Sequence, residues 1–298
     1  MKRTAIIATI LASALCSCTK EQAVAVKADG DTLVPIAFKT SGDFEVTATK
    51  VTDVTELSSI YVSATSGAAG SAEAQFSDMK NKSITLSGGQ GSSTYFWPAS
   101  GTLNFYATSW SVTPTVAASG LTCDVTAGTT DYVAGFARSV ANKTNPVELT
   151  LNHIFGRLYD VKFSCATGVT ATINSVKVTP AYSAGTYTFA TNTIAGKTAG
   201  SEASVTLATT SFSGSTATSV GQANVDRLVI PGNVTIEVKY TATRTGYSKQ
   251  FTKTATVNLP KGQKSVVTGT LTDDAAPISF SVTINPWTGP TEVAGTFN

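Results

Sequence analysis

The chain has little charge and few of the side chains that carry catalytic or metal chemistry. Only 13% of its 298 residues are charged, and it contains one histidine, four cysteines and two methionines. A single histidine excludes a His-rich metal site. Because the 21 basic and 19 acidic residues form no runs, neither a nucleic-acid groove nor a polybasic membrane patch is indicated. We therefore expect no metal, no cofactor and no nucleic-acid partner.

Long hydrophobic runs are also missing, with one exception at the start of the chain. Lys2 and Arg3 precede an apolar run over residues 5–15, which falls well short of the about 20 residues that cross a bilayer as a helix. This pattern is typical of a cleaved export signal. The run ends in LCSC, which resembles the bacterial lipobox, where the last cysteine, here Cys18, carries the lipid. We predict a lipoprotein signal peptide over residues 1–17, with a plain secretory signal as the alternative.

What the sequence does contain is alternation with a period of two. Two segments alternate apolar and polar residues strictly; their apolar members are Val234, Ile236, Val238 and Tyr240 in one and Ile278, Phe280, Val282 and Ile284 in the other. Weaker runs of the same kind are separated by Gly, Pro, Asn and Asp clusters, and no helical pattern exceeds two turns. Since parallel strands would need crossover helices, we predict an all-β fold of antiparallel β-sandwiches.

The predicted organisation is a tether followed by two tandem domains. Residues 18–32 are polar, free of aromatics and mixed in charge, as a flexible tether is. The rest of the chain is long enough for two sandwiches. The clearest break in composition is NKTNP at residues 142–146, so we place the domains at residues 33–145 and 146–298.

Two cysteines remain within the predicted domains. Cys123 and Cys165 each lie in a strand-like segment, and their spacing fits no metal site. In an exported protein such residues can form a disulfide or stay as buried free thiols. The sequence leaves both alternatives open.

The candidate catalytic groups have simpler structural interpretations. Any Ser-His-acid triad would have to use His153, but this residue lies in a strand-like run, which favours a packed or hydrogen-bonded histidine. Asp273 and Asp274 stand beside Pro277 in an apparent loop, where paired acids are more often turn residues than a glycosidase pair. We predict that the protein is not an enzyme.

Several motifs, taken in order, resemble the fimbrillin-like family, the type V pilus subunits of Bacteroidales-type bacteria. No single motif is specific, but their order and spacing are, and together they cover almost all of the mature chain. The motifs are VPIAF (34–38), YFWPASGTLNFYA (95–107), LNHIFGRLYDV (151–161), IPGNVTIEVKYT (230–241), KGQKSVVTGTL (261–271) and ISFSVTINPW (278–287).

The resemblance implies a surface lipoprotein with two transthyretin-like sandwiches, anchored in the outer membrane through lipid on Cys18. In the family, a protease removes an N-terminal strand, and the vacated groove accepts a C-terminal strand of the next subunit. The expected partners are therefore other pilus subunits, and the expected location is the fimbrium at the cell surface. Host or bacterial surface glycans or proteins are the expected targets of adhesion.

The same resemblance assigns site residues to this chain. The removable strand would be the one carrying Val34, Ile36 and Phe38. Candidate donor strands are the segment with Ile278, Phe280, Val282 and Ile284 and the tail over residues 292–297. Family members are typically cut after an arginine, but no arginine lies between Arg3 and Arg138, so Lys39 or Lys50 is the expected processing site.

A different function is suggested by the aromatic residues. Trp97 and Trp110, with neighbouring tyrosines, could form a flat platform for sugar rings, as in a surface-anchored carbohydrate-binding β-sandwich lipoprotein. The alternative is that both tryptophans pack in the core, which their place in alternating strands favours. Solvent exposure of the two side chains would distinguish these interpretations.

Overall fold

A computed structural model describes residues 33–42, 57–274 and 280–286. Within these ranges the chain is built from β-strands, with a single one-turn helix, α1 (Gln222–Val225), which confirms the all-β prediction. No helix in the described ranges is long and apolar enough to span a membrane. The predicted signal peptide, the whole tether with Cys18, Lys50 and the tail after residue 286 lie outside the described residues.

The first part of the fold contains two sheets, one small and one large. The small sheet has the order β10-β1-β5, and the larger one has the order β11-β9-β6-β2-β3, with β4 also paired to β2. The strands are β1 (Pro35–Ser41), β2 (Ser59–Ser66), β3 (Ala74–Gln75), β4 (Lys82–Thr85), β5 (Gln90–Phe96), β6 (Thr102–Thr108), β9 (Val133–Ala141), β10 (Val147–Thr150) and β11 (Asn152–His153).

A third sheet, β15-β14-β8-β7, packs on the larger sheet. Tyr106 of β6 shares a core cluster with Leu121 and Cys123 of β8 and with Tyr187 of β14, whereas Phe105 contacts Phe38 of the small sheet. Strand β6 is therefore covered on both faces, and every residue after its first is buried. The strands of the third sheet are β7 (Thr115–Ala117), β8 (Gly120–Thr126), β14 (Tyr182–Thr188) and β15 (Thr193–Ala199).

The remaining two sheets enclose the largest core. One has the order β18-β12-β22-β23 with β19 paired to β12, and the other has the order β16-β13-β20-β21 with β17 paired to β13. Their strands are β12 (Gly156–Cys165), β13 (Thr170–Pro180), β16 (Ala203–Val205), β17 (Ser211–Ser213), β18 (Thr218–Ser219), β19 (Arg227–Val229), β20 (Gly232–Arg244), β21 (Tyr247–Leu259), β22 (Gln263–Leu271) and β23 (Phe280–Pro286).

Strand β20 has the alternating burial that its sequence predicts. Its apolar side chains are fully buried while the residues between them are partly exposed, as expected for a strand with one face on a core. The long hairpin with β21 pairs thirteen residues in register, from Gly232 opposite Leu259 to Arg244 opposite Tyr247.

Two strand pairs are parallel, contrary to the purely antiparallel expectation. Strand β1 runs parallel to β10, and β12 runs parallel to β22. The antiparallel prediction assumed that parallel strands need crossover helices. Here strands make the crossover instead: β2 to β9 lie between β1 and β10 in the chain. The remaining strand pairs among the described residues are antiparallel.

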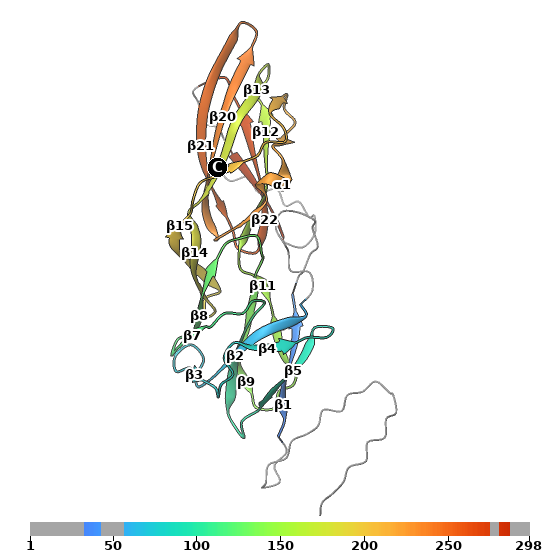
Figure 1. The fold of residues 1–298 in the computed structure, drawn as a ribbon, viewed down its shortest axis with the longest axis vertical. Helices are drawn as coiled ribbons and strands as arrows, with labels where there is room; N and C mark the ends of the chain where they lie inside the picture. Colours follow the sequence, from blue (N-terminus) through green and yellow to red (C-terminus); the bar gives the residue numbers. More distant parts are fainter. Residues whose placement is uncertain (1–32, 43–56, 275–279, 287–298) are drawn as a thin grey trace, which may run out of the picture. The chain divides into compact units, whose positions relative to one another are not determined.

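The predicted domain boundary at residues 145 and 146 stays a prediction. Residues 35–298 cluster as one compact unit, and three strand pairings cross the boundary: β10 with β1, β11 with β9, and β14 with β8. Figure 1 shows β8, from the first half, beside β14 and β15 of the second.

The two cysteines of the folded part are free thiols. Cys123 belongs to the cluster around β6 and β8, and Cys165 to the cluster between the two sheets of the second half. Burial raises the pKa of Cys123 to about 12 and also raises the pKa of Cys165. Of the two alternatives left open by the sequence, buried free thiols describe this fold.

Candidate functional site

Strand β1 lies between two strands that are distant from it in sequence. It pairs antiparallel with β5, as Figure 1 shows, and parallel with β10, so that Phe38 stands opposite both Gly91 and Val147. Ile36 and Phe38 are fully buried, and Val34, just before the strand, is partly buried. We call the space that β1 fills between β5 and β10 the β1 slot.

Aromatic side chains line the β1 slot. The ring of Phe38 meets the ring of Phe105 edge to face at 5.4 Å, and Trp97 meets the same ring at 5.6 Å. Trp97 is only 5% exposed, so it forms part of the wall of the slot. This contradicts its suggested role in a sugar platform, because a buried indole cannot present a flat face to a ligand.

Trp110 is packed in a different place. It is partly exposed and stacks on Tyr132 with ring centroids 4.5 Å apart and an interplanar angle of 14°. It also borders the core cluster around Tyr106. One face of its ring is therefore covered, and Trp97 and Trp110 do not form a joint platform.

Asn145 holds the start of β1 through its side chain. Its Oδ1 accepts hydrogen bonds from the Ala37 amide and from the Trp97 indole, both at 3.1 Å. Its Nδ2 donates to the carbonyl of Pro35 at 2.8 Å. The side chain thus continues the pairing that β10 begins two residues later. In the sequence, Asn145 is marked only as part of a composition break, because no local spacing pattern indicates a contact across more than a hundred residues.

The main chain of β1 is bonded along its length. The register with β5 shifts between Pro35 and Ala37, where Ser93 Oγ donates to the Ile36 carbonyl at 3.1 Å. At the other end, the Thr40 amide donates to the Gly89 carbonyl at 2.8 Å, and the Leu151 amide donates to the Ser41 carbonyl at 2.9 Å. The slot therefore offers backbone donors and acceptors on both sides.

The two candidate processing lysines differ in position. Lys39 lies within β1, where it pairs with Glu148 and Gln90 across the sheet; its side chain is exposed and 3.8 Å from the Glu148 carboxylate. Lys50 lies outside the described residues, in the segment between the end of β1 and the start of β2. A cut after Lys39 would leave Thr40 and Ser41 in the slot.

The first candidate donor strand is paired within its own sheet. Strand β23 lies antiparallel to β22, from Phe280 opposite Gly269 to Pro286 opposite Gln263. Val282 packs against the core of the second half, and Ile284 is partly buried. Ile278 and the tail over residues 292–297 lie outside the described residues.

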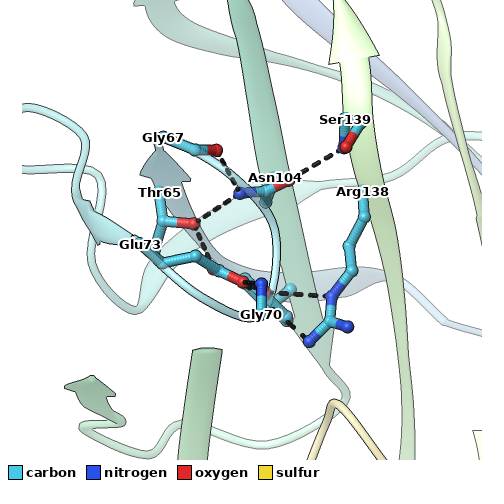
Figure 2. Close-up of polar contacts among 8 residues, drawn as sticks. Thr65, Gly67, Gly70, Glu73, Asn104, Arg138 and Ser139 are labelled. Carbon is cyan, nitrogen blue, oxygen red and sulfur yellow. Dashed lines mark hydrogen bonds and ion pairs between the residues drawn. The ribbon is translucent and has the colours of Figure 1, made fainter. Parts of the chain in front are cut away.

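A buried polar network braces the other face of the larger sheet. The Glu73 carboxylate accepts hydrogen bonds from Thr65 Oγ1 at 2.5 Å, the Gly70 amide at 2.7 Å and the Tyr106 hydroxyl at 2.6 Å (Figure 2). Arg138 lies 3.9 Å from this carboxylate and donates through Nε to the Tyr106 hydroxyl. Burial and the bond to Glu73 raise the pKa of Tyr106, so it stays a neutral donor.

Asn104 extends the network to the loop that leads to Glu73. Its Nδ2 donates to Thr65 Oγ1 and to the Gly67 carbonyl, and its Oδ1 accepts from the Ser139 amide at 2.8 Å (Figure 2). Gly67 has a φ of +95°, and a Cβ there would lie 2.1 Å from the Ala72 carbonyl oxygen. Except for Arg138 Nη2, which is buried without a hydrogen-bond partner among the described residues, these groups satisfy one another inside the fold, so the network is a brace for the 67–72 loop.

The candidate catalytic groups are engaged in structural contacts. His153 is 5% exposed and is hydrogen-bonded to the buried Asp131, which confirms the packed, hydrogen-bonded histidine. Asp273 pairs with Arg244 at 2.6 Å, and Asp274 accepts from the Thr272 hydroxyl. In the part of the chain that the structure describes, no three His, Cys, Asp or Glu side chains form a metal-binding group.

Comparison with known proteins identifies relatives of this fold. The sequence profile described as fimbrillin-like matches residues 46–287. A fimbrial protein from Bacteroides vulgatus superposes with a TM-score of 0.56 at 15% identity, covering 85% of this chain and 99% of the other. A candidate cell adhesion protein from Parabacteroides distasonis gives 0.52 at 10% identity, covering 85% and 96%. No curated protein matches the chain.

Proposed function

Because the chain belongs to the fimbrillin-like family, we propose that it is a structural or adhesive subunit of fimbriae that assembles by exchanging β1 for a strand of another subunit. The observation that carries this proposal is the β1 slot. A short strand near the start of the fold fills a place between β5 and β10, and its two inward side chains complete the core.

The slot has the physical properties that strand exchange requires. Removing β1 would leave the facing edges of β5 and β10 with unpaired N–H and C=O groups, which readily accept another strand. It would also uncover the sites of Ile36 and Phe38, each worth about 1.5–3 kcal/mol of apolar burial. An empty slot is therefore unstable, and a strand with matching alternation restores what was lost.

The tail over residues 292–297 is the better candidate for the donor. Strand β23 already pairs with β22, and Val282 packs on its own core. The tail carries Val293, Gly295 and Phe297 at alternate positions, in the same spacing as Val34, Ile36 and Phe38. A tail aligned in this way would place Phe297 where Phe38 lies, whereas Gly295 would bring no side chain to the site of Ile36.

Release of β1 is better served by cleavage after Lys50 than after Lys39. A folded strand paired on both sides is a poor protease substrate because its backbone is fully bonded. Lys50 follows β1 in the chain, so a cut there frees the whole strand.

We further propose that lipid on Cys18 anchors the precursor in the outer membrane. Cys18→Ala should therefore abolish lipid labelling and membrane retention, while Cys16→Ala should not.

The deciding experiment releases β1 by a controlled cut. A site for a specific protease is inserted after Lys50 in the full-length protein, and the cut and uncut forms are run on gels after mild denaturation. We expect ladders only after cutting. A peptide of residues 288–298 should suppress them, and the same peptide with Phe297→Asp should not, because a charge would be buried without a partner. A cut protein that stays monomeric at high concentration would contradict strand exchange.

A further inference from the structure

A cavity next to the β1 slot opens where three parts of the chain converge, and it shares Thr150 of β10 with the slot. It has a volume of about 230 Å³ and is lined by Ala134, Gly135 and Phe136 of β9, by Thr150 and Asn152 at the junction of β10 and β11, and by Tyr187 and Asn192 at the β14–β15 hairpin. The structural contacts described above leave the polar groups at its rim without an assigned role.

Contacts within the fold fix the position of Asn192 and leave its side-chain Nδ2 available to a ligand. Its backbone has a φ of +54°; its amide donates to the Phe189 carbonyl at 3.2 Å, and its carbonyl accepts from Lys261 Nζ at 2.8 Å. Its side-chain Oδ1 accepts from the Tyr187 hydroxyl at 2.8 Å. Among the described residues Nδ2 has no hydrogen-bond partner, so it is a pre-oriented donor at the cavity.

Asn152 supplies the complementary group. Its exposed Nδ2 lies 3.5 Å from the Thr150 carbonyl, a long contact, and its Oδ1 is an acceptor without a hydrogen-bond partner in the described part of the chain. Thr150 adds a hydroxyl, which can donate or accept and which lies 3.5 Å from the Ser41 hydroxyl. The rim thus combines an oriented donor, an exposed acceptor and a group that can act as either.

The rest of the lining restricts the class of ligand. None of the described residues that line the cavity is charged, and the partly exposed Phe136 gives it an apolar aromatic side, whereas Tyr187 lies buried beneath the cavity floor. Its volume is below the about 300–1,000 Å³ typical of sites for drug-sized molecules. A ligand with neighbouring hydroxyls on a compact ring, neutral and with one apolar face, matches these properties.

From this arrangement we propose that the cavity binds a single neutral pyranose unit, such as the terminal sugar of a glycan. Asn192 Nδ2 donates to one hydroxyl, Asn152 Oδ1 accepts from a neighbouring hydroxyl, and the C–H face of the ring packs on the aromatic side. The site is distinct from Trp97 and Trp110. It shares Thr150 with the β1 slot, but neither asparagine side chain is hydrogen-bonded to β1 among the described residues, so either proposal can fail without the other.

The test is a titration of the full-length protein with methyl glycosides, followed by the side-chain amide signals of its asparagines in NMR spectra. The panel contains methyl glycosides of galactose, glucose and N-acetylglucosamine, with a sialic acid glycoside as the charged comparison. We expect at least one neutral glycoside to shift the Asn152 and Asn192 amide signals in a saturable way, and the charged sugar to bind more weakly. No saturable shift at these two residues would overturn the proposal.

Substitutions locate the binding. Asn192→Gly keeps a residue that tolerates positive φ while removing the donor, and Asn152→Ala removes the acceptor. Each should weaken binding about fivefold to tenfold, the loss of roughly one hydrogen bond. Asn174→Ala, which alters an exposed amide on β13, should leave binding unchanged. Binding that survives both cavity substitutions together would overturn the assignment, and unchanged circular dichroism confirms that the variants fold.

Discussion

Strands β1 and β12 occupy similar positions in their sheets but are held in different ways. Each runs parallel to a strand that follows much later in the chain and antiparallel to another. Strand β12 pairs eight residues with β22, and four of its side chains enter the largest core. Strand β1 pairs four residues with β10 and has two fully buried side chains. Strand β12 is thus integral to its sandwich, whereas β1 has far fewer contacts to replace.

The polar contacts of the two strands differ as well. Arg157 of β12 forms a two-point ion pair with Asp226, and both side chains are completely buried. Strand β1 is held by the neutral, largely exposed side chain of Asn145. A buried ion pair cannot be opened without stranding a charge, while neutral hydrogen bonds at the surface exchange with water at small cost.

The largest effect is expected at the buried ion pair of β12. Asp226→Ala should lower the free energy of unfolding by about 3–5 kcal/mol, because it leaves the Arg157 charge buried without its carboxylate. Denaturant titration measures the loss. Arg157→Met combined with Asp226→Leu should recover much of it. If Asp226→Ala costs less than about 1 kcal/mol, the contrast between the two strands is wrong.

Truncating a core side chain of β1 should destabilise the protein only while β1 is present. Phe38→Ala should destabilise the uncut protein by about 3–5 kcal/mol, the usual cost of truncating a buried phenylalanine. After a cut behind residue 50 and removal of the released strand, the same variant should form ladders as the unmodified protein does. Phe105→Ala is the control, because its ring stays in the wall of the slot and its loss should weaken both forms.

An intermediate effect is expected at Asn145. Asn145→Ala removes two bonds to the β1 main chain and one to Trp97, so stability should fall by roughly 1–2 kcal/mol. Hydrogen exchange should show the Ala37 amide opening faster while amides of β12 stay protected. Equal acceleration in both strands would mean that β1 does not open separately.

The smallest effect is expected at Lys39. Its ion pair with Glu148 is exposed on both sides, and such pairs contribute about 0–1 kcal/mol. Lys39→Ala should therefore leave stability and processing nearly unchanged, while Lys50→Ala should block release of β1. Loss of processing in Lys39→Ala alone would assign the cut to β1 itself.

Much of the fold could be predicted from alternation of side chains, because burial of one face imposes a period of two on strands such as β20. The parallel pairs could not, since pairing between residues 38 and 147 leaves no trace in either local pattern. Trp97 was ambiguous for a related reason. An indole in or beside a strand can face the core or the solvent. In this fold, the positions of Phe105 and Asn145 determine that Trp97 faces the core.

The candidate site was predictable in outline only. The spacing of Val34, Ile36 and Phe38 marks an inward face, and the structure buries both Ile36 and Phe38 completely. Two contacts with β1 could not be predicted because they join distant parts of the chain. They are the hydrogen bonds of the Asn145 side chain and that of the Ser93 hydroxyl at the register shift between β1 and β5. The same holds for the cavity at Asn152 and Asn192, whose residues come from segments forty residues apart.

The side chain of Asn145 bonds only to main-chain atoms of β1, so these bonds do not depend on which side chains β1 carries. Under the proposed exchange, the Asn145 amide would hold the main chain of any extended strand, and the sites of Ile36 and Phe38 would select among strands by their side chains. Under the proposed strand exchange, subunits that keep Asn145 and the two apolar sites would stay compatible with one another while their outward residues vary. Such subunits would assemble into one fibre that presents different outward faces.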